Sequence, residues 1–134
     1  MVRRRPSLGL FGIFGRSPKL RQLDLALRTL DVHPRLVPEA VKLTIISLLE
    51  DHAIGGEPAP QAYRAAAELV GYCIMGAGAF MSEDEPERLA EVERRIERAL
   101  EFPSTLDAKL VLLTLHAGVI QPSVVEHFQL ESIE

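Results

Sequence analysis

The sequence predicts an all-α protein, a single-domain bundle of about six helices preceded by an irregular N-terminal arm. Three observations predict this class. Apolar residues recur at steps of three and four along most of the chain, which is the period of an amphipathic helix. Prolines stand at or just before the start of the periodic segments, where a helix tolerates them. The length of 134 residues suits one domain.

The first predicted helix covers residues 17 to about 32. Ser17 is a favourable N-cap, and Pro18 fits the first turn. Asp24 and Arg28 lie four residues apart and are expected to pair on the outer side. The apolar stripe consists of Leu20, Leu23, Leu27 and Leu30.

The second predicted helix covers residues 38–53, and Gly55 and Gly56 are expected to end it. Its wide apolar face consists of Val41, Leu43, Ile45, Ile46, Leu48 and Leu49.

The third predicted helix, residues 60–81, contains an uncharged stretch with three glycines. The glycines follow no strand and precede no lysine, so the stretch does not match a phosphate-binding loop. On one continuous helix, Ala67, Gly71 and Gly78 share a side. Small residues there predict close packing of another element, inside the monomer first and at a subunit interface second. A break near residues 76–78 is the alternative.

The fourth predicted helix, residues 86–101, is amphipathic and heavily charged. Two capping-box patterns in residues 82–87 precede it. Glu91 and Arg95 have the spacing of an intrahelical ion pair. The narrow apolar stripe consists of Leu89, Val92, Ile96 and Leu100.

The fifth predicted helix, residues 104–116, is apolar on nearly every side and is therefore expected to be the central helix. A buried strand over residues 110–115 is the alternative, but no second convincing strand exists to pair with it. The last helix is expected to begin at Pro122, with Ser123 and Glu126 in capping-box register, and to run to near the C-terminus.

Residues 1–16 form the arm, and residues 17–134 form the predicted helical domain. Glycines alternate with apolar residues in the arm and oppose a stable helix there. We expect its apolar side chains to pack in a groove of the same bundle or of a neighbouring subunit. These side chains are Leu10, Phe11, Ile13 and Phe14, together with Leu8.

The arm is also basic. The first 21 residues hold six bases and no acid, so the remaining nine bases and nineteen acids leave the body at −10. An acidic body argues against nucleic acid as a partner. Arg3, Arg4 and Arg5 offer an alternative, which is contact with an anionic membrane surface. A targeting sequence is a further alternative, weakened by the short, glycine-broken apolar region. The longest uncharged run has 13 residues, too short for a transmembrane helix.

No catalytic or metal-binding pattern stands out. The histidines His33, His52, His116 and His127 lack zinc or di-iron spacing. His116, near the end of the most apolar helix, is expected to be partly buried. The single cysteine, Cys73, cannot form an internal disulfide, which fits a reducing compartment, and its apolar neighbours predict a buried, inert thiol.

From these patterns we expect a cytoplasmic, non-enzymatic protein that binds another protein, its own copy included, without a cofactor or metal ion. A sensor domain for a small apolar ligand and an adaptor that attaches to membranes through the arm are the alternatives. The expected interface residues are Leu10, Phe11, Ile13, Phe14, Ala67, Gly71 and Gly78.

Overall fold

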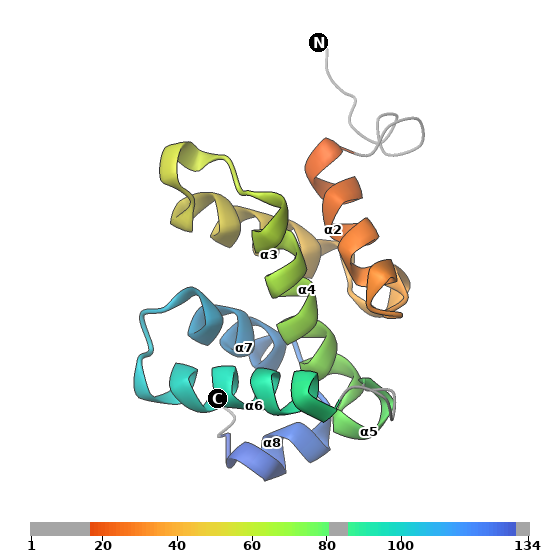
Figure 1. Cartoon of the computed structure of the whole chain (residues 1–134), viewed down its shortest axis with the longest axis vertical. Helices are drawn as coiled ribbons and strands as arrows, with labels where there is room; N and C mark the ends of the chain where they lie inside the picture. The colour runs from red at the N-terminus through yellow and green to blue at the C-terminus, as the bar shows by residue number, and fades with distance from the viewer. Residues whose placement is uncertain (1–16, 81–85, 131–134) are drawn as a thin grey trace.

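A computed structural model describes residues 17–80 and 86–130, and these residues form helices and no strand (Figure 1). The predicted all-α class is confirmed for them. The predicted capping boxes at residues 82–87 lie mostly outside the described residues. The elements are α2 (Pro18–Thr29), η1 (Pro34–Leu36), α3 (Glu39–His52), η2 (Ile54–Gly56), α4 (Pro60–Met75), α5 (Ala77–Phe80), α6 (Pro86–Glu101), α7 (Leu106–His116) and α8 (Pro122–Phe128).

Helix α4 is the centre of the bundle. It packs against α2, α3, α5, α6 and α7. Its buried residues include Tyr63, Ala66, Leu69, Val70 and Tyr72, so it contributes side chains to several sides of the core. The prediction that α7 is central was wrong. Helix α7 packs on α3, α4 and α6, and Leu112 on its remaining side is exposed.

The N-terminal helix begins as its sequence predicts. The Ser17 side chain accepts a hydrogen bond from the Leu20 backbone N–H at 3.2 Å, and Pro18 occupies the first turn. Asp24, however, does not lie on the outer side. Its carboxylate is mostly buried and forms an ion pair with Lys42 of α3, with 2.9 Å between Nζ and Oδ1. This pair ties α2 to α3.

The predicted third helix is broken at Gly76, the alternative that the sequence left open. Helix α4 ends at Met75, and Gly76 has φ +83°, a conformation that favours glycine. The reversal brings α5 back onto α4, and the Phe80 ring contacts Tyr72 edge-to-face with 6.1 Å between centroids. Gly78 therefore does not share a helix face with Ala67 and Gly71.

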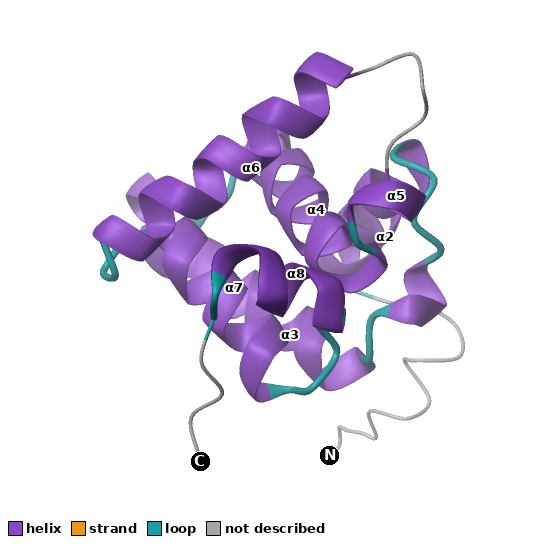
Figure 2. Cartoon of the chain, turned by 90° about the horizontal axis from the view of Figure 1, so that it is seen from below, coloured by secondary structure: helices purple, strands orange, loops and turns teal. Residues whose placement is uncertain are grey.

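Helix α8 lies across the end of the molecule opposite the start of α2 (Figures 1 and 2). The Gln121 backbone N–H donates to the Cys73 carbonyl at 2.8 Å, which anchors the start of α8 to the end of α4. Phe128 packs edge-to-face on Tyr72, with 6.3 Å between centroids. The helix ends at Phe128, and Gln121 is its N-cap, so the predicted cap at Ser123 was wrong.

Two further side-chain predictions were wrong. Leu43 and Leu100, assigned to apolar faces, are about half exposed. Ile46 and Ala99 lie in the buried sets of the same two helices. Among the described helices, none combines the length and apolar character needed to cross a bilayer.

Candidate interaction site

An apolar groove lies between α6, α7 and the end of α8. Its volume is about 260 Å³. Among the described residues that line it, only Gln129 has a polar side chain. The lining residues are Ala99, Leu100, Pro103, Ala108, Val111, Leu112, Leu115, Phe128, Gln129 and Leu130.

The groove has a buried floor and an exposed rim. Ala108, Val111 and Phe128 form the floor and are nearly inaccessible to solvent. On the rim, Leu100 is 50% exposed and Leu112 is 38% exposed. Apolar side chains left in water at the edge of a concave apolar surface are typical of a site that binds another apolar group.

Local sequence explains how the groove forms. In α7, Ala108, Val111, Leu112 and Leu115 follow the spacing of one helix face. At the other wall, Gln129 adopts a left-handed conformation with φ +56° and reverses the chain. The reversal lets the Leu130 backbone N–H donate to the Val125 carbonyl at 2.9 Å, which places Leu130 beside Phe128.

The predicted interface residues divide into three groups. Leu10, Phe11, Ile13 and Phe14 lie outside the described residues. Ala67 and Gly71 are buried in the core, so they serve close packing inside the monomer. Gly78 is exposed, and a Cβ placed on it would meet nothing within 4 Å.

Gly71 is a point of close approach. A Cβ built on it would lie 2.9 Å from Val32 Cγ2 and 3.1 Å from Phe80 Cε1. Both distances are shorter than an ordinary van der Waals contact. Glycine at this position therefore lets the returning α5 and the segment after α2 rest against α4.

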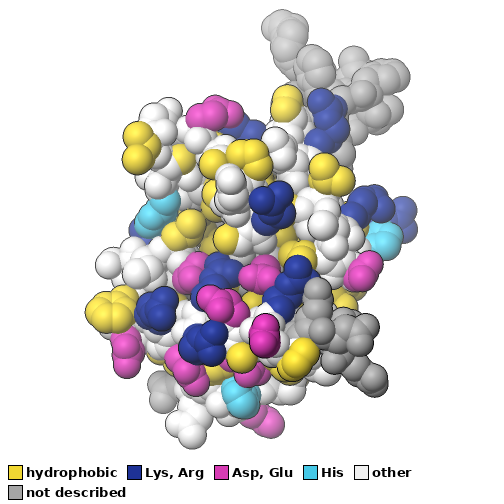
Figure 3. All heavy atoms as spheres, viewed as in Figure 1, with side chains coloured by type: hydrophobic (Ala, Val, Ile, Leu, Met, Phe, Trp, Pro, Cys, Tyr) yellow, Lys and Arg dark blue, Asp and Glu magenta, His cyan; other side chains and the backbone are white. Residues whose placement is uncertain are grey.

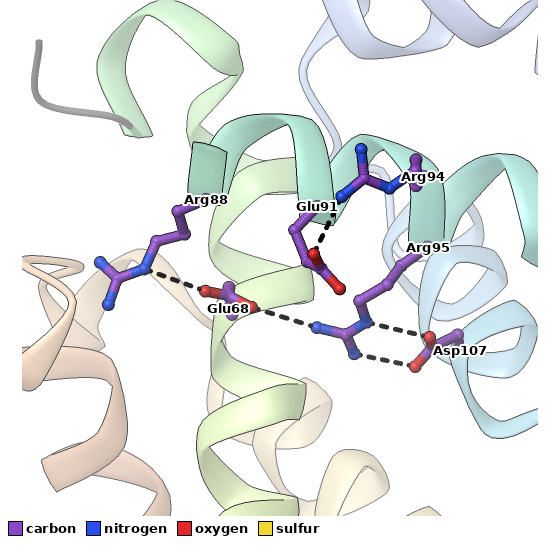
Figure 4. Close-up of polar contacts among 6 residues, drawn as sticks. All are labelled: Glu68, Arg88, Glu91, Arg94, Arg95 and Asp107. Carbon is purple, nitrogen blue, oxygen red and sulfur yellow. Dashed lines mark hydrogen bonds and ion pairs between the residues drawn. The ribbon is translucent and has the colours of Figure 1, made fainter. Parts of the chain in front are cut away.

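Charged side chains of both signs gather over α6 and the adjoining helices (Figure 3). At their centre, Arg95 of α6 donates to both carboxylate oxygens of Asp107 in α7, at 3.0 and 2.9 Å (Figure 4). Its other nitrogen lies 3.4 Å from Glu68 of α4, which also pairs with Arg88 at 3.2 Å. This ion cluster joins three helices.

The ion cluster is satisfied by its own members. Glu91, expected to pair with Arg95, instead accepts from Arg94 at 3.0 Å, so that prediction was wrong. Each of the charges at the centre has an opposite charge beside it. We therefore assign the cluster to the stability of the fold rather than to binding.

The buried thiol and phenol have raised pKa values. Burial raises the pKa of Cys73 from 9.0 to about 12, which keeps the thiol protonated and unreactive at neutral pH. Burial, followed by a 2.9 Å hydrogen bond that its hydroxyl donates to Glu93, also raises the pKa of Tyr72. Neither group is activated as a nucleophile or base.

The histidines are not brought together. His33 Nδ1 accepts from the Arg35 backbone N–H at 3.1 Å, and His52 lies 3.2 Å from Lys109 Nζ. His127 contacts Phe128 edge-to-face, with 4.5 Å between the ring centroids. His116 is exposed, contrary to the expectation of partial burial. Within residues 17–80 and 86–130, no three histidine, cysteine or acidic side chains are grouped as metal ligands would be.

The groove itself was not predicted. Its signal in the sequence is the excess of apolar residues in α7, where Leu112 and Leu115 exceed what one buried face requires. From the sequence alone, that excess predicts burial of the helix on all sides. A short helix with more apolar residues than its buried face needs is equally typical of a surface on which another segment packs.

Fold and groove together define the chain as a small all-α domain with an open apolar groove. Comparisons give no relative: the chain matches no family model, and no curated protein or solved structure is significantly similar to it.

Proposed function

We propose that this chain is a non-enzymatic protein-interaction module whose groove between α6, α7 and α8 binds an apolar protein segment, with its own copy as a partner. The observation that carries the proposal is the exposed leucine rim over an apolar floor. Completing the burial of Leu100 and Leu112 contributes about 1 kcal/mol each, since both are already partly covered.

The size of the groove favours side chains as its occupants. Its volume of about 260 Å³ lies below the ~300–1,000 Å³ of ordinary small-molecule pockets. Among the described lining residues, the side chain of Gln129 alone offers an amide group to orient a polar ligand. Apolar side chains of a protein segment need no such group, so this occupant suits the groove better than a metabolite.

A cytoplasmic location belongs to the proposal as well. Its support is the lone cysteine, which is buried and free and therefore needs no oxidising compartment. Arg3, Arg4 and Arg5, named for the alternative of membrane attachment, lie outside the described residues.

Sedimentation velocity across a concentration series tests the proposal. We expect wild type to associate as its concentration rises. Leu112→Glu places a charge on the groove rim, which disfavours burial of that rim, so it should weaken association at least tenfold.

Leu25→Glu is the matched control. Leu25 is a more exposed leucine, at 63%, and lies on α2 away from the groove. The proposal expects Leu25→Glu to associate like wild type. A wild type that stays monomeric, or two variants with equal effects, would contradict it.

A further inference from the structure

We infer that the occupant of the groove is the apolar part of the N-terminal arm, residues 8–14, of a second copy of this chain. The inference rests on the proposed function and names the segment that binds. Three arguments carry it: chemistry, charge and reach.

The chemistry of the arm matches the groove. Residues 8–14 contain Leu8, Leu10, Phe11, Ile13 and Phe14, separated by glycines and without a charge. The groove offers an apolar floor for such side chains. Full burial of a phenylalanine or leucine side chain contributes about 1.5–3 kcal/mol, so a few of these residues offset the ordering of a short segment.

The arm is basic, whereas the rest of the chain is acidic. Residues 1–16 carry four arginines and no acid, a charge of +4. Residues 17–134, the rest of the chain, carry eleven bases and nineteen acids, a charge of −8. This opposite charge favours contact between the arm of one copy and the body of another over contact between two arms, and the apolar floor of the groove selects the place of contact.

The reach of the arm favours a second copy over the same chain. Helix α2 begins at the upper end of the molecule, and α6, α7 and α8 lie at the lower end (Figure 1). Phe11 is six residues before Ser17, so it reaches at most about 20 Å from the start of α2. A compact chain of this length is roughly 35 Å across, from a radius of gyration of about 14 Å. The aromatic residues of the arm therefore fall short of their own groove.

A fluorescent peptide with the sequence of residues 1–16 tests the inference by anisotropy. Its target is the full chain carrying Phe11→Asp and Phe14→Asp, whose own arm is disabled and whose groove is free. We expect saturable binding. Adding Leu112→Glu to the target should weaken binding at least tenfold, and adding Leu25→Glu should leave it unchanged.

Mixing full-length variants gives a second test. The Phe11→Asp/Phe14→Asp chain keeps its groove, and the Leu112→Glu chain keeps its arm. Each alone is expected to be monomeric, and an equal mixture is expected to form a one-to-one complex.

The outcomes separate the inference from the proposed function. If Leu112→Glu dissociates wild-type oligomers and the arm substitutions do not, the inference is overturned and the groove remains an interface. A peptide that binds phosphatidylserine-containing vesicles but not the chain also overturns it. If Leu112→Glu has no effect on association, the proposed function fails.

Discussion

At Gly71 the backbone of α4 lies against side chains from two other parts of the chain, Val32 and Phe80. At Gly78, by contrast, the added Cβ would stand in open space. Each glycine costs its own helix, α4 for Gly71 and α5 for Gly78, up to about 1 kcal/mol relative to alanine. Only at Gly71 does the missing side chain allow close packing, against Val32 and Phe80. Substitution by alanine should therefore lower the stability of the fold at Gly71 and not at Gly78.

Gly71→Ala is expected to destabilise the fold by about 1–2 kcal/mol, because the new methyl group displaces buried side chains that have little room to move. Gly78→Ala is the matched control and should be neutral or stabilising by up to about 1 kcal/mol. Urea unfolding monitored by circular dichroism measures both. Equal stability of the two variants would show that the close approach at Gly71 is not real.

Alkaline unfolding tests the buried thiol. Burial raises the folded-state pKa of Cys73 from 9.0 to about 12, so the folded chain keeps a proton that the unfolded chain loses. Its stabilisation is complete below pH 9 and falls as pH rises toward 12. Between pH 8 and pH 10 the loss from this group is on the order of 1 kcal/mol.

Cys73→Ala removes that contribution and leaves those of the tyrosines in place. We expect urea-unfolding free energies of wild type to fall more steeply over this pH range than those of Cys73→Ala. Parallel pH dependences would mean that the thiol is more accessible than the structure places it.

Among the elements, α6 is held to its neighbours by ion pairs as well as by its apolar stripe. Arg95 bridges Asp107 of α7 and Glu68 of α4, and its side chain is largely buried. Arg94, the residue before it, forms an exposed ion pair with Glu91. Removal of the arginine from a buried ion pair leaves a poorly solvated carboxylate, which lowers the stability of the fold. Removal of an arginine from an exposed pair leaves a carboxylate that water solvates, so the stability changes little.

Arg95→Ala is therefore expected to destabilise the fold by about 1–3 kcal/mol. Arg94→Ala should cost no more than about 0.5 kcal/mol. A double-mutant cycle with Asp107→Ala, measured by urea unfolding, isolates the coupling between α6 and α7. Additive effects of Arg95→Ala and Asp107→Ala would contradict a direct bridge.

Local signals in the sequence were enough to predict where most helices begin, but not which residues of different helices contact one another. The cap at Ser17 and the start of the third helix at Pro60 depend on neighbouring residues alone, and both were predicted. The sequence does not distinguish the roles of Gly71, Gly76 and Gly78. In the structure Gly71 is a point of close packing, Gly76 breaks the helix with a positive φ, and Gly78 is exposed. Arg95 likewise pairs with Glu68 and Asp107 of other helices, although Glu91 is nearer along the chain.

The molecule as a whole has an acidic body, a basic arm and an apolar groove at the end far from the start of α2 (Figure 1). An apolar periodicity does not distinguish residues that face the core from residues that face a partner, which is why Leu112 and Leu115 misled the prediction of a central α7. The structure separates the two cases by placing α4 at the centre and leaving one side of α7 open. Association of two copies would cover that side.

The most direct measurement is photocrosslinking from the arm. Full-length chain with benzoylphenylalanine in place of Phe11 is prepared with ¹⁴N and with ¹⁵N, mixed, irradiated and digested for mass spectrometry. We predict crosslinked peptides that combine both isotopes and join the arm to the end of α6, to α7 or to α8. Crosslinks confined to a single isotope, or mapping to α2 and α4 instead, would contradict the account.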